Sequence, residues 1–251
     1  MVSTRTRRLI IALVIGVLLL LIIGTIIYLT RRSVGHRVIH TDTCPRPKHY
    51  ATNYDYDYTQ NSREHQNLNS TIDYFRLSLS WSPTFCEGKR NVKDLFQCQH
   101  VFGFIVHGLW PSKFRRNNTS HSLRSHPRNC RNEKEIPLTL IEKYFCLMPS
   151  EQLMQAEWEK HGTCYWEKAE DYFEQINKLY SKTRLPTNIN EILNNQTISK
   201  RQRRQAIKDS FLLLNPPLTS EQIDVIMTHK GRKLKEVALC YDHQFNHINC
   251  N

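Results

Sequence analysis

The chain has 251 residues, of which 39% are hydrophobic and 10% aromatic, a composition that provides for a packed core and excludes a wholly disordered chain. Its length predicts one domain with additional segments. The 35 Lys and Arg residues outnumber the 23 Asp and Glu residues, and the resulting charge of +12 favours polyanionic partners such as nucleic acid or an anionic membrane, although solubility alone also explains it.

An uncharged run rich in Leu, Ile and Val, residues 9–30, follows the short basic N-terminal segment 1–8. The run is about as long as a helix that crosses a bilayer. It is longer than the roughly 7–15 apolar residues of a signal-peptide core. Arg31 and Arg32 follow it, where a cleaved leader would have small residues. The sequence therefore favours an uncleaved transmembrane signal anchor over a removed signal peptide, which makes the membrane an expected partner.

Residues 31–70 are polar and poor in aliphatic side chains, a composition typical of a stalk or linker. Tyrosines are spaced through this segment, at Tyr50, Tyr54, Tyr56 and Tyr58. They either form a strip that stacks on nucleic-acid bases or dock partly on the domain, and the pattern favours docking. Cys44 predicts that part of the stalk is tied to the domain.

The eight cysteines are scattered along the chain without a C-x-x-C pair, which argues against a zinc ribbon. An even number of scattered cysteines is typical of disulfides formed in an oxidising compartment. The large C-terminal part is therefore expected outside the cytosol, in a lumenal, periplasmic or cell-surface position, or secreted if the leader is removed. Four N-glycosylation triplets agree with this only weakly, at Asn69, Asn117, Asn118 and Asn195.

The folded domain is predicted to occupy residues 71–251. Its first strand is predicted over residues 75–81, where large apolar side chains alternate with Arg and Ser, and Pro83 ends it. A second strand is predicted over residues 101–109, and its apolar, β-branched composition indicates burial on both faces. His107 lies near the end of this strand.

Beyond these strands, residues 112–135 are basic and rich in turn formers, and they predict a long surface loop. Helices are predicted over residues 138–147, 150–161, 169–183 and 220–229. Basic residues crowd residues 199–208, where they either grip phosphates or line the solvated face of a helix, and the pattern favours the solvated face. A last strand is predicted over residues 234–241. The chain is therefore predicted to be an α+β domain whose mainly antiparallel central sheet is flanked by helices.

Three side chains of different charge type share one face of the predicted helix 150–161. Glu157, Lys160 and His161 are three or four positions apart, so they project from the same side. A crowded carboxylate, ammonium and imidazole suit an acid–base site, although such a trio is more commonly a surface cluster. The three residues are therefore candidates that need a partner elsewhere in the chain.

His107 is the candidate partner of this trio. Two imidazoles with ordinary pKa values of about 6.5 permit one neutral and one protonated ring, which accept a proton from a nucleophile and donate one to a leaving group. RNA suits this pair because its 2′-OH is the nucleophile, which DNA lacks. Trp110 offers an indole for stacking on a base. The alternatives are a structural histidine, or a zinc site from His107, Glu157 and His161, which the charge of Lys160 disfavours.

Two segments resemble the active-site motifs of one known family. Residues 104–111, Phe-Ile-Val-His-Gly-Leu-Trp-Pro, and residues 157–164, Glu-Trp-Glu-Lys-His-Gly-Thr-Cys, look like the two active-site segments of the ribonuclease T2 family. Residues 77–86 and 235–242 resemble the first core strand and the late strand of that family. The resemblance covers about residues 73–250, and two long motifs in the right order are highly specific.

The resemblance implies an α+β fold and cleavage of single-stranded RNA, without a metal or other cofactor, through a 2′,3′-cyclic phosphate. It implies that His161 is the general base on the 2′-OH and that His107 is the general acid on the departing 5′-oxygen. By the same resemblance, Glu157 and Lys160 stabilise the transition state and Trp110 helps to hold a base. It also implies three disulfides and leaves Cys44 and Cys146 as a fourth pair; the three are Cys86–Cys98, Cys130–Cys164 and Cys240–Cys250.

The chain departs from the family pattern at two positions near the motifs. Ala156 stands where many members carry a His that helps to hold the phosphate, and Ser112 stands where some carry an Asp that reads the base. A membrane-spanning start is also unusual, because most members are soluble and secreted. These departures leave open an alternative function, a weakly active or inactive ribonuclease-fold protein that binds RNA or acts in signalling.

Overall fold

The computed structural model describes residues 16, 35–36, 44–56, 65–87, 95–114, 126–228 and 230–250. Apart from Gly16, the predicted membrane anchor, residues 9–30, lies outside these ranges, as does the basic segment 1–8. Within the described ranges, no helix combines the length and the apolar character needed to cross a membrane. The membrane anchor therefore stays a prediction.

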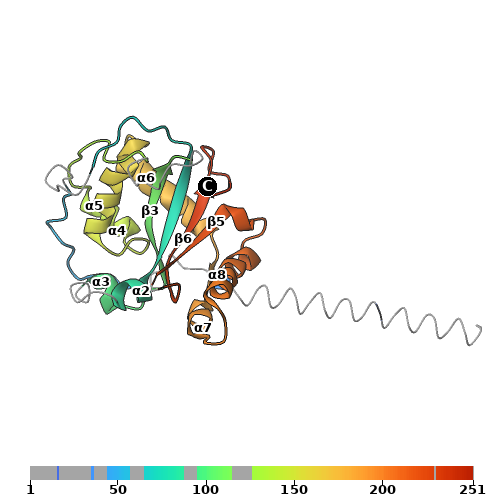
Figure 1. The fold of residues 1–251 in the computed structure, drawn as a ribbon. Helices are drawn as coiled ribbons and strands as arrows, with labels where there is room; N and C mark the ends of the chain where they lie inside the picture. The colour runs from blue at the N-terminus through green and yellow to red at the C-terminus, as the bar shows by residue number, and fades with distance from the viewer. Residues whose placement is uncertain are drawn as a thin grey trace, which may run out of the picture.

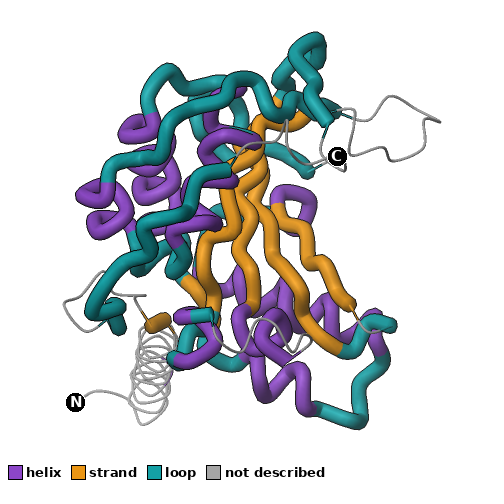
Figure 2. The backbone as a smooth tube through the Cα atoms, turned by 90° about the vertical axis from the view of Figure 1, so that its left-hand side faces the viewer, coloured by secondary structure: helices purple, strands orange, loops and turns teal. Residues whose placement is uncertain are grey.

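The central sheet has four antiparallel strands in the order β3-β2-β6-β5. Its strands are β2 (Tyr74–Trp81), β3 (Phe104–Ser112), β5 (Ile223–Thr228) and β6 (Lys233–Tyr241). Figure 2 shows the strands running side by side, with helices packed around them. The predicted α+β fold with an antiparallel sheet flanked by helices is confirmed.

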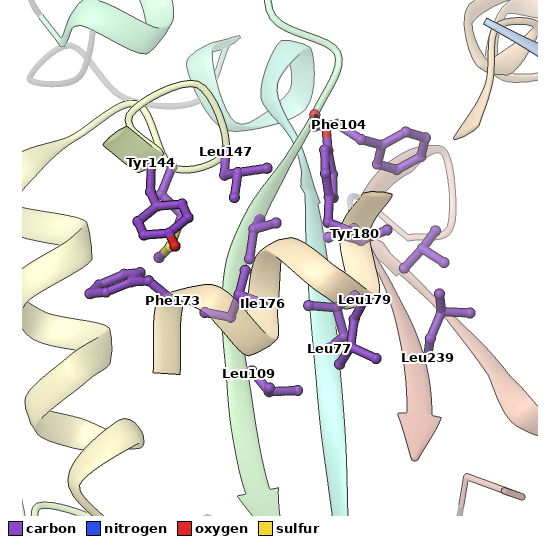
Figure 3. Close-up of a cluster of buried hydrophobic side chains, with 14 of the residues drawn as sticks. Leu77, Phe104, Leu109, Tyr144, Leu147, Phe173, Ile176, Leu179, Tyr180 and Leu239 are labelled. Atoms are coloured by element: carbon purple, nitrogen blue, oxygen red, sulfur yellow. Dashed lines mark hydrogen bonds between the residues drawn. The ribbon is translucent and has the colours of Figure 1, made fainter. Parts of the chain in front are cut away.

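One face of the sheet forms the floor of the hydrophobic core. Leu77 and Leu79 of β2 are fully buried, and because they are two residues apart they point to the same side. Helix α6 (Ala169–Lys182) crosses this face, and Figure 3 shows its Leu179 beside Leu77. Side chains between these positions, such as Ser78, point to the opposite face. This second face is where polar groups of the sheet gather.

The helices flank the sheet on two sides. Figure 1 shows α4 and α5 beside β3, and α7 and α8 on the side of β5. The bounds of the remaining helices are α2 (Ser82–Glu87), α3 (Phe96–Gln99), α4 (Leu138–Tyr144), α5 (Glu151–Lys160), α7 (Ile189–Asn194) and α8 (Lys200–Leu214). Single 3₁₀ turns form at Gly162–Cys164 and Ser220–Gln222, and a short pair joins β1 (Gly35–His36) to β4 (Leu185–Pro186).

The helix predicted over residues 220–229 is wrong. After one 3₁₀ turn the chain becomes β5, in which buried Ile223 and Val225 flank exposed Asp224. This alternation has the period of a strand, and β6 offers it a partner along its whole length. The apolar residues therefore pack on the sheet as a strand, although the turn that precedes β5 has the capping residues of a helix start.

The strand predicted over residues 101–109 begins and ends three residues later. Val101 is fully exposed, whereas β3 pairs with β2 from Phe104, opposite Trp81, to Ser112, opposite Tyr74. Pro111 lies inside the strand, which is tolerated because β3 is at the edge of the sheet and needs hydrogen-bond partners on one side only. The predicted burial of both faces is confirmed, since most residues of β3 are buried.

The basic stretch 199–208 forms the first half of α8. Ser199 caps the helix by accepting a hydrogen bond from Gln202 N–H at 3.2 Å. Lys200 and Arg204 are exposed, as predicted for a solvated helix face. Arg203 differs, because it is buried and donates to the carbonyl oxygen of Asn195 at 2.8 Å.

All eight cysteines are paired, and the predicted pairing is confirmed. The disulfides are Cys44–Cys146, Cys86–Cys98, Cys130–Cys164 and Cys240–Cys250. Four cross-links agree with folding in an oxidising compartment. Their positions attach the N-terminal segment, two loops and the C-terminus to the domain.

Part of the predicted stalk, residues 44–56, packs on the domain. Cys44 is bonded to Cys146, and the buried Tyr54 donates a hydrogen bond to the carbonyl oxygen of Ile136 at 2.8 Å. Tyr50 packs edge-on against Phe145, with ring centroids 5.2 Å apart. The docking predicted for these two tyrosines is confirmed, whereas Tyr58 lies outside the described residues.

Candidate active site

His107 lies on β3 where the pairing with β2 becomes irregular. The register shifts between Ser78, opposite Gly108, and Leu79, opposite Val106, so that His107 has no direct partner on β2. Such a bulge bends the strand and redirects a side chain. The imidazole is accordingly accessible, with 34% of the side chain exposed, although its strand neighbours are buried.

Glu157 and His161 come from the end of α5. The helix begins at Ser150, whose hydroxyl accepts a hydrogen bond from Leu153 N–H, and it ends at His161. One turn of helix separates the two site residues, and Glu157 Oε2 lies 3.8 Å from His161 Nε2. Glu157 Oε1 lies 3.5 Å from His107 Nε2. One buried carboxylate therefore lies between the two imidazoles.

Trp110 fixes this carboxylate. Its indole N–H donates a hydrogen bond to Glu157 Oε2 at 2.7 Å. Its ring centroid is 5.1 Å from that of His107 and 5.4 Å from that of His161. The geometry thus gives Trp110 contacts with three of the other predicted site residues.

Lys160 lies at the last turn of α5, next to His161. Its ammonium is 4.5 Å from the ring centre of Tyr56, which belongs to the docked stalk. This is within the range of a cation–π interaction. Its charge also lowers the pKa of both Glu157 and His161. The structure therefore brings all five predicted site residues together, and it adds a tyrosine from the stalk beside them.

Gly108 allows β3 to approach α5 closely. A side chain at this position would collide with the carboxylate of Glu157 and with the indole nitrogen of Trp110. Glycine is used here for close approach rather than for an unusual backbone angle. The hydrogen bond between Glu157 and Trp110 therefore depends on a missing β-carbon.

Gly108→Ala is expected to lower the free energy of unfolding by about 1–3 kcal/mol, because the added methyl group must displace Glu157 or Trp110. Urea unfolding of the variant and of the parent protein measures the difference. The matched control is Gly103→Ala, whose β-carbon would lie 3.4 Å from Trp81, an ordinary contact. The control is expected to change stability by less than about 1 kcal/mol. Equal stability of the two variants would contradict the close packing of β3 on Glu157.

Burial and two carboxylates act in opposite directions on His107. Burial disfavours the charged ring, but the carboxylates of Glu157 and Glu236 outweigh it and raise the pKa of His107 above its ordinary value. The hydrogen-bond geometry agrees, since His107 Nδ1 lies 3.4 Å from Glu236 Oε2. His107 is therefore suited to keep its proton to a higher pH than a free imidazole.

The environment of His161 has the reverse effect. Burial is the main cause that lowers the pKa of His161 well below its ordinary value, and the nearby charges of Arg128, His107 and Lys160 lower it further. His161 Nδ1 is buried and has no hydrogen-bond partner among the described residues, so a proton on that nitrogen gains no acceptor there. His161 is therefore suited to remain neutral where His107 is charged.

Glu157 is a carboxylate under opposing influences. Burial raises its pKa above the ordinary value, whereas the charge of His107 and the hydrogen bond from Trp110 favour the ionised form. Its carboxylate oxygens lie 3.5 Å from His107 Nε2 and 3.8 Å from His161 Nε2. A protonated His107 and an ionised Glu157 therefore stabilise each other.

Glu236 is a site residue that the sequence reasoning missed. It is buried on β6, and its carboxylate accepts a hydrogen bond from Ser78 and contacts His107. A Glu inside an apolar strand, Leu234–Tyr241, was the available indication, because carboxylates are rarely buried without a partner. The partner itself lies 129 residues away in the sequence.

A second missed group lies on the segment that follows the long loop. Asn129 N–H donates to the carbonyl oxygen of Lys160 at 3.0 Å, and Cys130 is bonded to Cys164. These contacts fix the segment to the end of α5, and Arg128 is close enough to lower the pKa of His161 and Glu157. The site is therefore more cationic than its motif residues indicate.

The site is held from the core side by Tyr172. Its buried hydroxyl accepts a hydrogen bond from Leu109 N–H at 3.2 Å, which links α6 to β3 next to the site.

As to the zinc alternative, no group of three or more His, Cys, Asp or Glu side chains in the described part of the chain is arranged to hold a metal ion. The zinc site considered from His107, Glu157 and His161 is therefore not supported.

The chain is similar to ribonucleases along most of its length. A model of the ribonuclease T2 family matches residues 72–250. A probable ribonuclease of Haemophilus influenzae is 31% identical over 195 residues, which cover 74% of this chain and 63% of that protein. A ribonuclease of Aeromonas hydrophila is 35% identical over 115 residues, which cover 46% of this chain and 48% of that protein. The chain thus spans less than two thirds of the length of either relative.

Solved structures with the same fold are more distant. The crystal structure of RNase NT in complex with 5′-AMP matches with a TM-score of 0.50 and 21% sequence identity, over 72% of this chain and 91% of that one. At this identity the similarity concerns the fold alone.

Proposed function

Because the chain belongs to the ribonuclease T2 family, we propose that it is an endoribonuclease that cleaves single-stranded RNA without a metal or cofactor. The observation that carries the proposal is the pair of imidazoles, His107 and His161, on the one buried carboxylate of Glu157. The pKa of His107 is raised and that of His161 is lowered, which favours a protonated His107 beside a neutral His161. Such a divergence supports the proposal that His107 is the acid and His161 the base.

In the proposed first step, neutral His161 accepts the proton of the 2′-OH, and the 2′-oxygen attacks phosphorus. The bond to the 5′-oxygen breaks, and protonated His107 donates its proton to that oxygen. The products are a 2′,3′-cyclic phosphate and a free 5′-OH. In the second step water replaces the 5′-OH and the two rings exchange roles, which gives a 3′-phosphate.

The remaining site residues stabilise charge and position the substrate. Lys160 and Glu157 are proposed to stabilise the phosphorane-like transition state, in which negative charge grows on the phosphoryl oxygens. Arg128 supplies further positive charge beside His161. Trp110 is proposed to contact a base with the part of its ring that the Glu157 hydrogen bond leaves available. These groups compensate in part for Ala156, which provides no charge to the phosphate.

The proposed arrangement in the cell is a membrane-anchored catalytic domain outside the cytosol. Residues 9–30 are the proposed signal anchor, residues 31–70 the linker and residues 71–251 the catalytic domain. The four disulfides support an oxidising compartment. RNA and the membrane are the proposed partners, and the protein is secreted if the leader is cleaved.

The test is cleavage of a single-stranded RNA by the purified full-length chain in detergent with EDTA present. We expect a 2′,3′-cyclic phosphate product and a bell-shaped pH dependence of kcat/KM. The acidic limb is expected below about pH 6.5 and the alkaline limb above it, because the pKa of His161 is lowered and that of His107 is raised. DNA of the same sequence and 2′-O-methyl RNA are the controls, since neither has the nucleophile.

Two results would contradict the proposal. A rate that falls neither below nor above about pH 6.5 would exclude a mechanism with two histidines. RNA that binds without forming a cyclic phosphate would favour the alternative, a ribonuclease-fold protein with a binding or signalling function. Ala156 is the observation that suggests this alternative.

A further inference from the structure

We propose that Glu236 is a positioning residue that holds Nδ1 of His107, so that Nε2 is presented to the reacting phosphate. This inference rests on the proposed function, in which His107 is the general acid. It adds a second carboxylate to the site, on a strand that neither active-site motif contains. The test below reports on Glu236 whether or not the chain cleaves RNA.

The geometry of Glu236 gives each of its oxygens one partner. Glu236 Oε2 lies 3.4 Å from His107 Nδ1, and Oε1 accepts a hydrogen bond from the hydroxyl of Ser78. Glu236 is on β6 and Ser78 on β2, so the central strand of the three orients the carboxylate toward the edge strand β3. The carboxylate is buried, which restricts it to this orientation.

His107 is thereby bound at both ring nitrogens, each by a different carboxylate. Nδ1 faces Glu236 and Nε2 faces Glu157, at 3.4 Å and 3.5 Å. His161 lacks such a contact, since its buried Nδ1 has no hydrogen-bond partner among the described residues. Of the two rings, only that of the proposed acid, His107, is therefore held at Nδ1, the nitrogen that does not face the reaction.

The contact with Glu236 selects the tautomer that the reaction needs. A carboxylate accepts a hydrogen bond, so it holds the proton of His107 on Nδ1. When Nε2 donates its proton to the 5′-oxygen, the neutral ring that remains carries its hydrogen on Nδ1. This tautomer leaves Nε2 as an acceptor, which is required for the hydrolytic step. Without Glu236 the neutral ring also populates the tautomer with the hydrogen on Nε2, which cannot accept.

Two charged groups besides Glu236 act on the protonation of His107. Glu157 of α5 raises its pKa, and Lys235 of β6 lowers it. The charge of His107 in turn acts on His161 at the end of α5. Removal of the Glu236 charge leaves one carboxylate against burial and Lys235, so the pKa of His107 falls. The ring then loses its proton at lower pH, and the alkaline limb of the pH–rate profile moves down.

The decisive variant is Glu236→Gln in the full-length chain, which keeps the size of the side chain and removes the charge. We expect the alkaline limb of kcat to move down by about one pH unit or more. At neutral pH, kcat is expected to fall about tenfold with little change in KM, as for a group that acts through the general acid. The matched control is Asp224→Asn on β5, a half-exposed carboxylate of the same sheet that pairs with Arg76, and it is expected to leave the profile unchanged.

The ¹⁵N chemical shifts of the histidine rings provide a readout that needs no activity. In the parent protein, neutral His107 is expected to carry its hydrogen on Nδ1, and in Glu236→Gln it is expected to titrate at lower pH. If Glu236→Gln does not fold, Ser78→Ala keeps the charge but releases one oxygen of the carboxylate, and it is expected to give a mixture of tautomers. An unchanged titration and an unchanged tautomer of His107 would overturn the proposal, even if the chain proves to be an active ribonuclease.

Discussion

Replacing His161 by alanine is expected to lower kcat for RNA cleavage by about 10²–10⁴-fold, because the 2′-OH then has no general base. His107→Ala is expected to cause a loss of similar size, because the 5′-oxygen must leave without a proton. KM is expected to change little in both variants, since neither ring is needed to hold the RNA. Steady-state kinetics on a short single-stranded RNA, at the pH optimum of the parent protein, measures both losses.

A substrate with a nitrophenyl leaving group separates the two roles. Nitrophenolate departs without protonation, so His107→Ala is expected to recover most of its activity on a nucleoside 3′-(nitrophenyl phosphate). His161→Ala is expected to remain impaired on the same substrate, because the 2′-OH must still be deprotonated. If the recovery occurs in His161→Ala instead, the two roles are reversed. The control His100→Ala removes an exposed ring whose described contacts are with Phe96, and it is expected to retain full activity.

Removing the Cys44–Cys146 disulfide is expected to cause the largest loss of stability of any single cross-link. The two cysteines are 102 residues apart, and a loop of this size is worth about 4–5 kcal/mol in the unfolded-chain model. The same bond holds the stalk segment with Tyr54 in the core and Tyr56 against Lys160. We therefore expect Cys44→Ser/Cys146→Ser to unfold at a clearly lower urea concentration and to lose part of its activity.

The control for this prediction is the disulfide with the shortest loop. Cys240 and Cys250 are 10 residues apart, so Cys240→Ser/Cys250→Ser is expected to lose less, roughly 3 kcal/mol by the same model. Cleavage activity measured well below the unfolding transition separates the effect on the site from the effect on stability. A smaller loss for the long loop than for the short one would contradict a docked stalk.

The sequence was sufficient to predict the geometry of those parts of the site that lie within one segment of the chain. Glu157 and His161 are one helical turn apart, and that spacing alone places them on the same face of α5. The alternation of β2 and the cap at Ser150 likewise predicted a strand and a helix close to their observed bounds. Each of these depends on local geometry, which a single sequence records directly.

The contacts between distant segments could not be predicted in the same way. Glu236 meets His107 only because β6 lies beside β2, and nothing near Glu236 in the sequence specifies that neighbour. The helix wrongly predicted at residues 220–229 has the same origin, since β5 forms against a partner strand that the local pattern does not reveal. Tyr56 reaches Lys160 because a disulfide far from both holds the stalk on the domain.

For a chain anchored as proposed, the disulfide at Cys44 also limits how far the domain can lie from a bilayer. With residues 9–30 as the proposed anchor, the chain between membrane and domain ends no later than Cys44 rather than at residue 70, and the pairing of β1 with β4 shortens it further. A fully extended chain spans at most about 3.3–3.6 Å per residue, so residues 31–43 allow a distance of roughly 45 Å at most. An active site on a tether of this length would be confined to RNA that comes to the membrane surface. Reduction of this bond would leave the β1–β4 pair and the docked Tyr50 and Tyr54 as the attachments of this segment, so a longer tether also requires those contacts to break.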